Sequence, residues 1–145
     1  MKVEQKLQID VIKGNRMHYR KYGDLTLITD GYIGVYLKNN ELKIDLSKMQ
    51  EITNGFDTLS PSEMQKKYQD AKETNHAISL SYGFAILVKS ESSFCYLQEK
   101  LIKMFPGKTG VKILNETSPV LIMKYGIPYG IILPVKIRED IRNDK

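Results

Sequence analysis

The sequence has few of the residues that build cross-linked or metal-bound sites. Among its 145 residues there is a single cysteine, Cys95, which excludes an intramolecular disulfide and a four-cysteine zinc site. Its two histidines, His18 and His76, have no cysteine or histidine at ligand spacing, so we expect neither a metal site nor a cofactor. A Gly-x-Ser-x-Gly elbow and a phosphate-binding loop are also absent, which removes two common catalytic classes.

Long apolar runs are missing as well. The longest, such as residues 84–88, cover a few residues, whereas a membrane-spanning helix needs about 20. The first residues of the sequence lead into no apolar signal stretch. Together with the single thiol, these features predict a soluble, cytoplasmic protein without a membrane partner.

The residues that are present suit one globular domain over 1–145. Hydrophobic residues make up 41% of the chain and charged residues 27%, both ordinary values for a folded domain. A turn-like stretch at 53–57 separates two pseudo-halves, 1–54 and 76–137, and the charged tail 138–145 is expected to fray. The net charge of +5 permits an acidic partner without requiring one.

The front half is predicted to be rich in strands. Leu7, Ile9 and Val11 alternate with polar residues, as in a half-buried strand. The dipeptide Asp30-Gly31 predicts a tight turn between two strands, because glycine accepts a positive φ. The further strands are expected at 25–29, 32–37 and 42–46.

The back half is predicted to mix helices with strands. Ser60 and Pro61 favour a helix start, and this helix is expected to end near residues 74–75. A second helix is predicted from Ser90 or Ser92 to the Pro106-Gly107 stop. The expected strands are 78–82, 84–88, 111–114, 119–125 and 129–137. The predicted fold is therefore α+β, a mainly antiparallel sheet with two helices and a βαβββ unit in the C-terminal half.

One acidic pattern could carry catalysis. Asp30 is followed by Glu41 and Lys43, and an Asp and a Glu-x-Lys on adjacent strands resemble the PD-(D/E)xK nucleases. That resemblance implies carboxylates that hold Mg²⁺ and a lysine that stabilises developing charge. Asp30 is equally explained as a turn residue, and Glu41 and Lys43 as the solvent side of a strand.

A basic and aromatic cluster lies between 16 and 22. Such a mixture can pair with phosphates while tyrosines stack on bases, although charges of this kind also protect edge strands. The residues predicted to bind nucleic acid are Arg16, Tyr19, Arg20, Lys21 and Tyr22.

Two segments resemble the sliding clamps that tether DNA polymerases. Thr29-Asp30-Gly31-Tyr32 is similar to a turn that joins two clamp strands. Pro119-Val120-Leu121-Ile122, followed by the run from Ile132 to Ile137, is similar to the closing strands. A clamp domain would place a helix early in the front half, where the sequence predicts none before Ser60. The resemblance implies one clamp-like module, associated with a phage or mobile element, that forms a ring only if several copies assemble.

Three functions remain open from the sequence. The preferred one is a non-enzymatic binding module that engages nucleic acid or a replication or host protein. The second is the Mg²⁺-dependent nuclease, which requires its two carboxylates to lie within reach of one ion. The third is a structural module that acts as a homo-oligomer.

Overall fold

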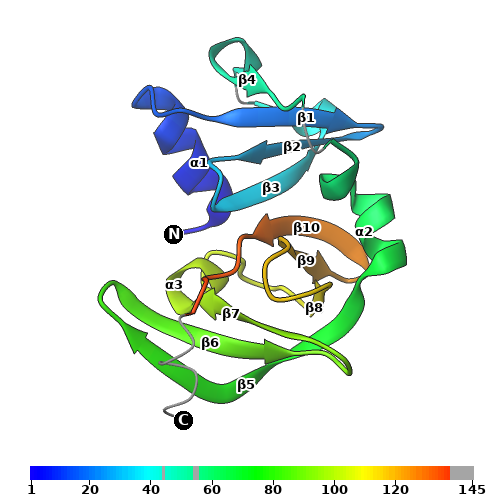
Figure 1. Ribbon diagram of the computed structural model, residues 1–145. Helices are drawn as coiled ribbons and strands as arrows, with labels where there is room; N and C mark the ends of the chain where they lie inside the picture. The colour runs from blue at the N-terminus through cyan, green and yellow to red at the C-terminus, as the bar shows by residue number, and fades with distance from the viewer. Residues whose placement is uncertain (44, 54–55, 138–145) are drawn as a thin grey trace.

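The computed structural model describes residues 1–43, 45–53 and 56–137 (Figure 1). Over these residues it contains the helices α1 (Val3–Ile12), α2 (Pro61–Lys67) and α3 (Glu99–Ile102). The strands of the N-terminal part are β1 (His18–Tyr22), β2 (Leu25–Thr29), β3 (Ile33–Lys38) and β4 (Gln50–Glu51). Those of the C-terminal part are β5 (Gln69–Leu80), β6 (Gly83–Lys89), β7 (Phe94–Gln98), β8 (Gly110–Ile113), β9 (Val120–Lys124) and β10 (Ile127–Ile132). Short 3₁₀ turns lie at Asn39–Glu41 (η1), Leu46–Lys48 (η2) and Phe56–Leu59 (η3).

All of these strands belong to one sheet. Their order is β4-β1-β2-β3-β10-β9-β8-β5-β6-β7. Every pairing is antiparallel except the short parallel contact of β1 with β4. The predicted α+β class with a mainly antiparallel sheet is confirmed, with three helices in the described residues where two were expected.

A helix followed by a three-stranded meander occurs twice in the chain. We call α1 with β1–β3 the N-terminal unit and α3 with β8–β10 the C-terminal unit. Because β7 precedes α3, the predicted βαβββ order of the C-terminal half is confirmed. The two units meet where β3 pairs with β10, with Gly130 opposite Val35 and Ile131 opposite Gly34.

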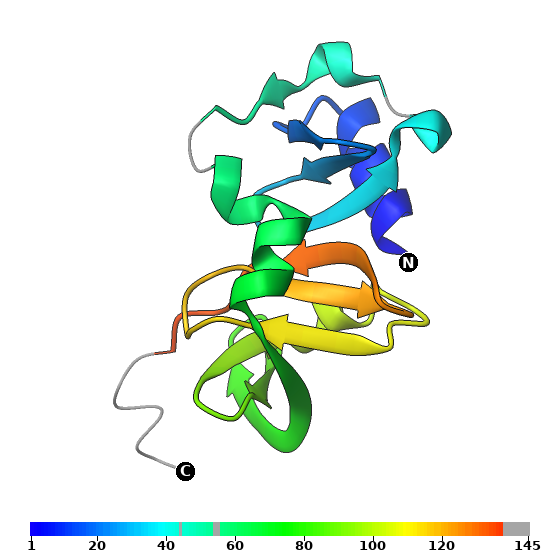
Figure 2. The same cartoon turned by 90° about the vertical axis from the view of Figure 1, so that its right-hand side faces the viewer.

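The helices cover both faces of the sheet. α1 and α3 lie on one face, where Leu7 and Leu101 join a large buried cluster with alternate residues of the central strands. α2 lies on the opposite face, where Met64 packs against Leu27 and Leu121. Figure 2 shows α2 in front of the strands and α1 behind them. Burial on both faces explains why β3 and β9 are almost continuously apolar.

The strands at one edge of the sheet, β5, β6 and β7, fold back towards the segment after β10. β5 is long enough to pair with β8 through residues 69–71 and with β6 through its remaining length. β7 then meets the segment after β10, where the Val135 amide donates to the carbonyl of Tyr96 at 2.8 Å. Strands β5, β6 and β7 and the segment after β10 therefore share a second, smaller core that includes Ile78, Leu87 and Val135.

The prediction of a strand at Leu7, Ile9 and Val11 is wrong, because these residues belong to helix α1. Val3 and Leu7 are fully buried at a spacing of one helical turn, whereas Ile9 lies on the exposed side. The main-chain amide of Val3 donates to the carbonyl of Met104 at 2.9 Å, which fixes the start of α1 beside α3.

Three further element predictions need correction. The strand expected at 42–46 is replaced by the 3₁₀ turns η1 and η2, with residue 44 outside the described residues. α2 starts after Ser60 as predicted but ends at Lys67, because Tyr68 turns its ring into the core beside Met64 and β5 begins at once. The long helix expected before Pro106 is instead strand β7 followed by the single turn α3. The predicted tail 138–145 and part of the predicted turn at 53–57 lie outside the described residues.

Candidate functional site

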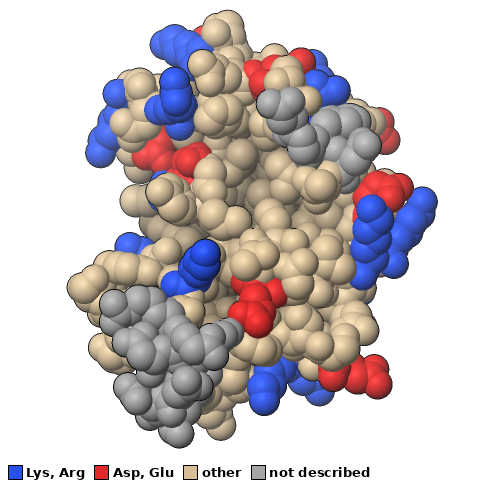
Figure 3. Space-filling model, in the orientation of Figure 1, with Lys and Arg blue, Asp and Glu red and all other residues tan. Residues whose placement is uncertain are grey.

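A cavity of about 560 Å³ opens on the face that carries α1 and α3. We call it the helix-side cleft. Figure 3 shows the surface hollowed at its left edge, between the upper part that carries α1 and the lower part that carries β5 and β6. Its volume lies within the range of small-molecule sites, about 300–1,000 Å³. Its lining residues come from both halves of the chain: Lys6, Asp30, Tyr32, Tyr82, Gln98, Lys100, Leu101 and Met104.

The turn between β2 and β3 holds Tyr32 in the upper wall of the cleft. One carboxylate oxygen of Asp30 accepts from the amides of Tyr32 and Ile33 at 2.9 and 3.0 Å. The carbonyl of Tyr32 accepts from the amide of Leu133 at 2.8 Å. Gly31 has a φ of 98°, which glycine adopts without strain. The backbone of Tyr32 is thus fixed, while the residue is 65% exposed.

Lys6 ties helix α1 to this turn. Its ammonium group lies 2.6 Å from a carboxylate oxygen of Asp10 and 2.6 Å from one of Asp30. Burial alone would lower the pKa of Lys6, but the hydrogen bonds and charges of the two carboxylates outweigh it and raise that pKa above its ordinary value. Burial has the opposite effect on a carboxylate and would raise the pKa of Asp10, yet hydrogen bonds from Lys6 and Asn15 hold that pKa below its ordinary value.

The tip of the β5–β6 hairpin holds Tyr82 in the lower wall. Leu80 pairs with Gly83, so Ser81 and Tyr82 form a two-residue turn that leaves Tyr82 50% exposed. The ammonium of Lys100, on α3, lies 5.8 Å from the centre of the Tyr82 ring, within the range of a cation–π contact. Lys100 forms no ion pair with any described residue.

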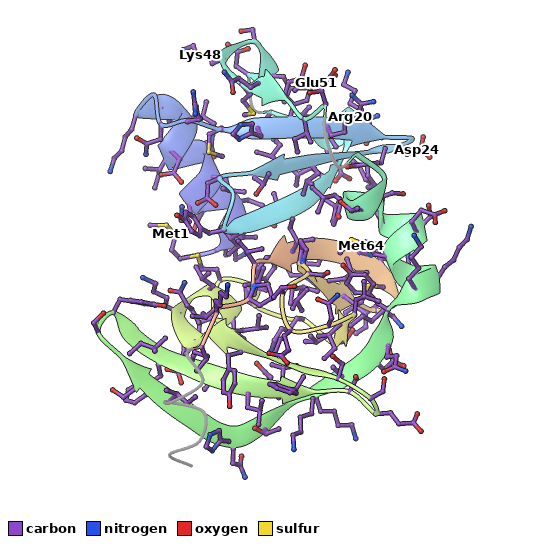
Figure 4. All side chains as sticks on the ribbon, viewed as in Figure 1. Met1, Arg20, Asp24, Lys48, Glu51 and Met64 are labelled. Carbon is purple, nitrogen blue, oxygen red and sulfur yellow. The ribbon has the colours of Figure 1, made fainter. Side chains whose placement is uncertain are left out.

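The predicted nucleic-acid residues lie on or beside β1, away from this cleft. Side chains alternate along a strand, so Tyr19 packs on the α1 side and Tyr22 on the α2 side. Arg20 pairs with Glu51 at 3.2 Å and donates to the carbonyl of residue 52 at 3.3 Å, and Figure 4 shows Arg20 and Glu51 side by side. Arg16 and Lys21 are exposed. The structure therefore divides the cluster between two faces, and its binding role stays a prediction.

The predicted nuclease residues are not brought together. Asp30 precedes β3 and Glu41 follows it, in η1. The six residues of β3 between them span about 20 Å at about 3.3 Å per residue, which is far beyond the reach of one shared Mg²⁺. Lys43 follows Glu41 in a segment that is not a strand, and Asp30 is held by Lys6 instead. Over the described residues, no three His, Cys, Asp or Glu side chains gather to hold a metal.

The thiol of the single cysteine is shielded from solvent. Cys95 lies in β7 and is buried, and burial raises the pKa of its thiol to about 12. The reactive thiolate is therefore scarce at neutral pH. This geometry suits a packing role for Cys95.

The cleft residues were missed as a group by the sequence analysis. Tyr32 and Tyr82 each lie beside a turn glycine, at Gly31 and Gly83, and an aromatic residue in a tight turn between strands is the one local signal that could have marked them. Their convergence on Lys100 depends on the packing of α1 and α3, which no local pattern specifies.

Two further findings do not concern the cleft. No helix in the part that the structure describes has the length and apolar character to span a bilayer. Comparison of the chain with protein-family models, with curated proteins and with solved structures finds no match.

Proposed function

We propose that the protein is a non-enzymatic module that binds nucleic acid in the helix-side cleft. The observation that carries this proposal is the convergence on one cavity of two exposed tyrosines and a lysine, Lys100, that forms no ion pair with the described residues. Tyrosine rings that stack on bases and cations that meet phosphates are the two elements of sequence-tolerant nucleic-acid binding. The net charge of +5 favours the approach of a polyanion.

The resemblance to a sliding clamp belongs to the same proposal. It depends on the repeated order of a helix and three strands in the two units. One chain holds a single pair of such units, so a ring around nucleic acid would require several copies related by symmetry. A replication protein of a phage, a mobile element or a host cell would then be the natural second partner.

The salt dependence of binding tests the proposal, and it distinguishes binding in the cleft from binding by the basic residues on and beside β1, which we call the β1 cluster. For single strands, the logarithm of the affinity falls by about 0.7 per phosphate contact for each tenfold rise in salt. Lys6 is already held by two carboxylates, so we count one phosphate contact in the cleft, made by Lys100. A rise from about 50 to about 200 mM salt should therefore weaken binding about threefold. Contacts from Arg16 and Lys21 would weaken it about sevenfold, since Arg20 is already held by Glu51.

The measurement is fluorescence anisotropy with a labelled oligothymidylate of about 12 nucleotides and with its duplex. Lys100→Ala should weaken binding and flatten the salt dependence. The double variant Arg16→Ala with Lys21→Ala should leave both unchanged. Lys66→Ala, on α2 across the sheet, removes the same charge and serves as the matched control. If neither the single strand nor the duplex binds at low salt, the proposed function is wrong.

A further inference from the structure

We infer that the helix-side cleft accepts one unpaired base between Tyr32 and Tyr82, so that its ligand is single-stranded nucleic acid. This inference rests on the proposed function and specifies the ligand of the same site. It follows from the shape and chemistry of the cavity and is independent of the total charge of the protein.

Two of the residues that line the cleft are aromatic, and they come from separate turns. Tyr32 comes from the β2–β3 turn and Tyr82 from the β5–β6 hairpin, and both line the same cavity of about 560 Å³. The exposed fractions are 65% for Tyr32 and 50% for Tyr82, so most of the Tyr32 surface and half of the Tyr82 surface are free to contact a ligand. A flat heteroaromatic ring covers such faces by stacking, whatever the base.

The remaining lining residues suit the other parts of a nucleotide. Leu101 and Met104 supply apolar contact at the base of the cleft, and the side-chain amide of Gln98 can donate to or accept from a base edge. The ammonium of Lys100 lies over the Tyr82 ring, so it must move aside for a base to stack on that face, where it can then meet the phosphate. Lys6 offsets the charge of only one of its two carboxylate partners, so Lys6, Asp10 and Asp30 together keep one net negative charge beside the cleft.

The cleft is preorganised for this task. The carbonyl of Tyr32 is held by Leu133 and its amide by Asp30. Helix α1, which carries Lys6, is joined to the end of α3 through Val3 and Met104. Because the backbone of Tyr32 is already ordered, little conformational entropy is lost there on binding.

A paired base cannot enter such a cavity while it stays in the duplex. It must first leave the stack, which costs free energy for unpairing and unstacking, whereas a base in a single strand has no pair to break. The cleft should therefore discriminate strongly between a single strand and a duplex of the same length. A strand that carries phosphates but no bases should also bind weakly.

The test compares three labelled probes by anisotropy: an oligothymidylate of about 12 nucleotides, an abasic strand of equal length, and the corresponding duplex. We expect the oligothymidylate to bind tightest. Tyr32→Ala and Tyr82→Ala should each weaken its binding about 5- to 150-fold, the range for one lost stacking contact. Tyr82→Phe keeps the ring and should bind within about twofold of the wild type. Tyr125→Ala, at the exposed β9–β10 turn, is the matched control and should change nothing.

Each outcome separates the inference from the proposed function. Equal binding of duplex or abasic strand overturns base insertion and leaves nucleic-acid binding intact. Preference for the single strand that survives Tyr32→Ala and Tyr82→Ala overturns the assignment of the site. Absence of binding by all three probes overturns the inference and the proposed function together.

Discussion

The junction of the two units predicts a large effect from one added methyl group. A Cβ atom at Gly130 would lie 2.2 Å from the carbonyl oxygen of Gly34 and 2.5 Å from a ring carbon of Phe105. The oxygen belongs to the backbone of β3, so it can move only if the strand moves. β3 and β10 are joined at just this point of the sheet, with Gly130 opposite Val35.

The magnitude follows from the nature of the obstacle. Extra methyl groups in packed cores cost about 1–3 kcal/mol when side chains can adjust. Since backbone must move here, we expect Gly130→Ala to lower the free energy of unfolding by at least about 3 kcal/mol. For a chain of this size each kcal/mol lowers Tm by about 3 °C, so Tm should fall by about 10 °C.

Urea denaturation followed by circular dichroism measures this effect. Gly110→Ala is the matched control, because its added Cβ would lie 3.7 Å from Met123, an ordinary contact, and it should change stability by less than about 1 kcal/mol. Gly34→Ala should fall between the two, since its nearest neighbours are side-chain atoms at 3.0 Å. If Gly130→Ala is as stable as Gly110→Ala, the described junction is wrong.

Three other predictions use groups away from this junction. Cys95 should resist alkylation in the folded protein at pH 8 and react fully in the unfolded protein, because burial raises the pKa of its thiol to about 12. Equal alkylation rates in the folded and unfolded protein would contradict the buried position of Cys95. The hydrogen bonds that lower the pKa of Asp10 should stabilise the fold above its unfolded pKa of about 4, and this effect should be lost as the pH falls through the folded value. Asp10→Asn should therefore flatten the acid limb of the curve of unfolding free energy against pH. Tyr125 and Gly126 form a two-residue turn in which Tyr125 has a φ of 51°. Tyr125→Asn should therefore raise the free energy of unfolding by about 0.5–1 kcal/mol in urea denaturation. An unchanged free energy would show that the Tyr125 backbone is not strained.

The turns and hairpins were the most predictable part of the fold. Asp30-Gly31 and Gly126 mark the β2–β3 and β9–β10 connections, because the conformation of a tight turn is decided by a few adjacent residues. The apolar strands beside these turns were predictable for the same reason. At these turns and strands, the conformation that the local residues favour is the one that the folded protein adopts.

Predictions failed where a local pattern fitted two structures. Leu7 and Val11 satisfy both a helical and an alternating period, and the choice of helix is fixed by contacts such as that of Val3 with Met104. Phe94 and Leu101 lie at helical spacing, yet Phe94 pairs with Lys89 of β6 in a strand. These contacts join residues that are distant in the chain or depend on strand pairing, which no local window contains.

The site was less predictable than the fold. Asp30 was expected to bind Mg²⁺ or to make a turn, and the structure shows the turn role together with an ion pair to Lys6 from another element. Tyr32 and Tyr82 are fifty residues apart in the sequence, so their meeting in one cleft depends on how the hairpins pack. The β1 cluster, by contrast, was adjacent in sequence and is divided by strand alternation.

Photo-crosslinking tests the central claim most directly. The protein has nine tyrosines and no tryptophan, so an oligonucleotide that carries 5-iodouracil should report its position through crosslinked tyrosines identified by mass spectrometry. The account predicts crosslinks at Tyr32 or Tyr82 that an excess of unlabelled single strand removes. Crosslinks confined to Tyr19, Tyr22 or Tyr125, or none at all, would contradict it.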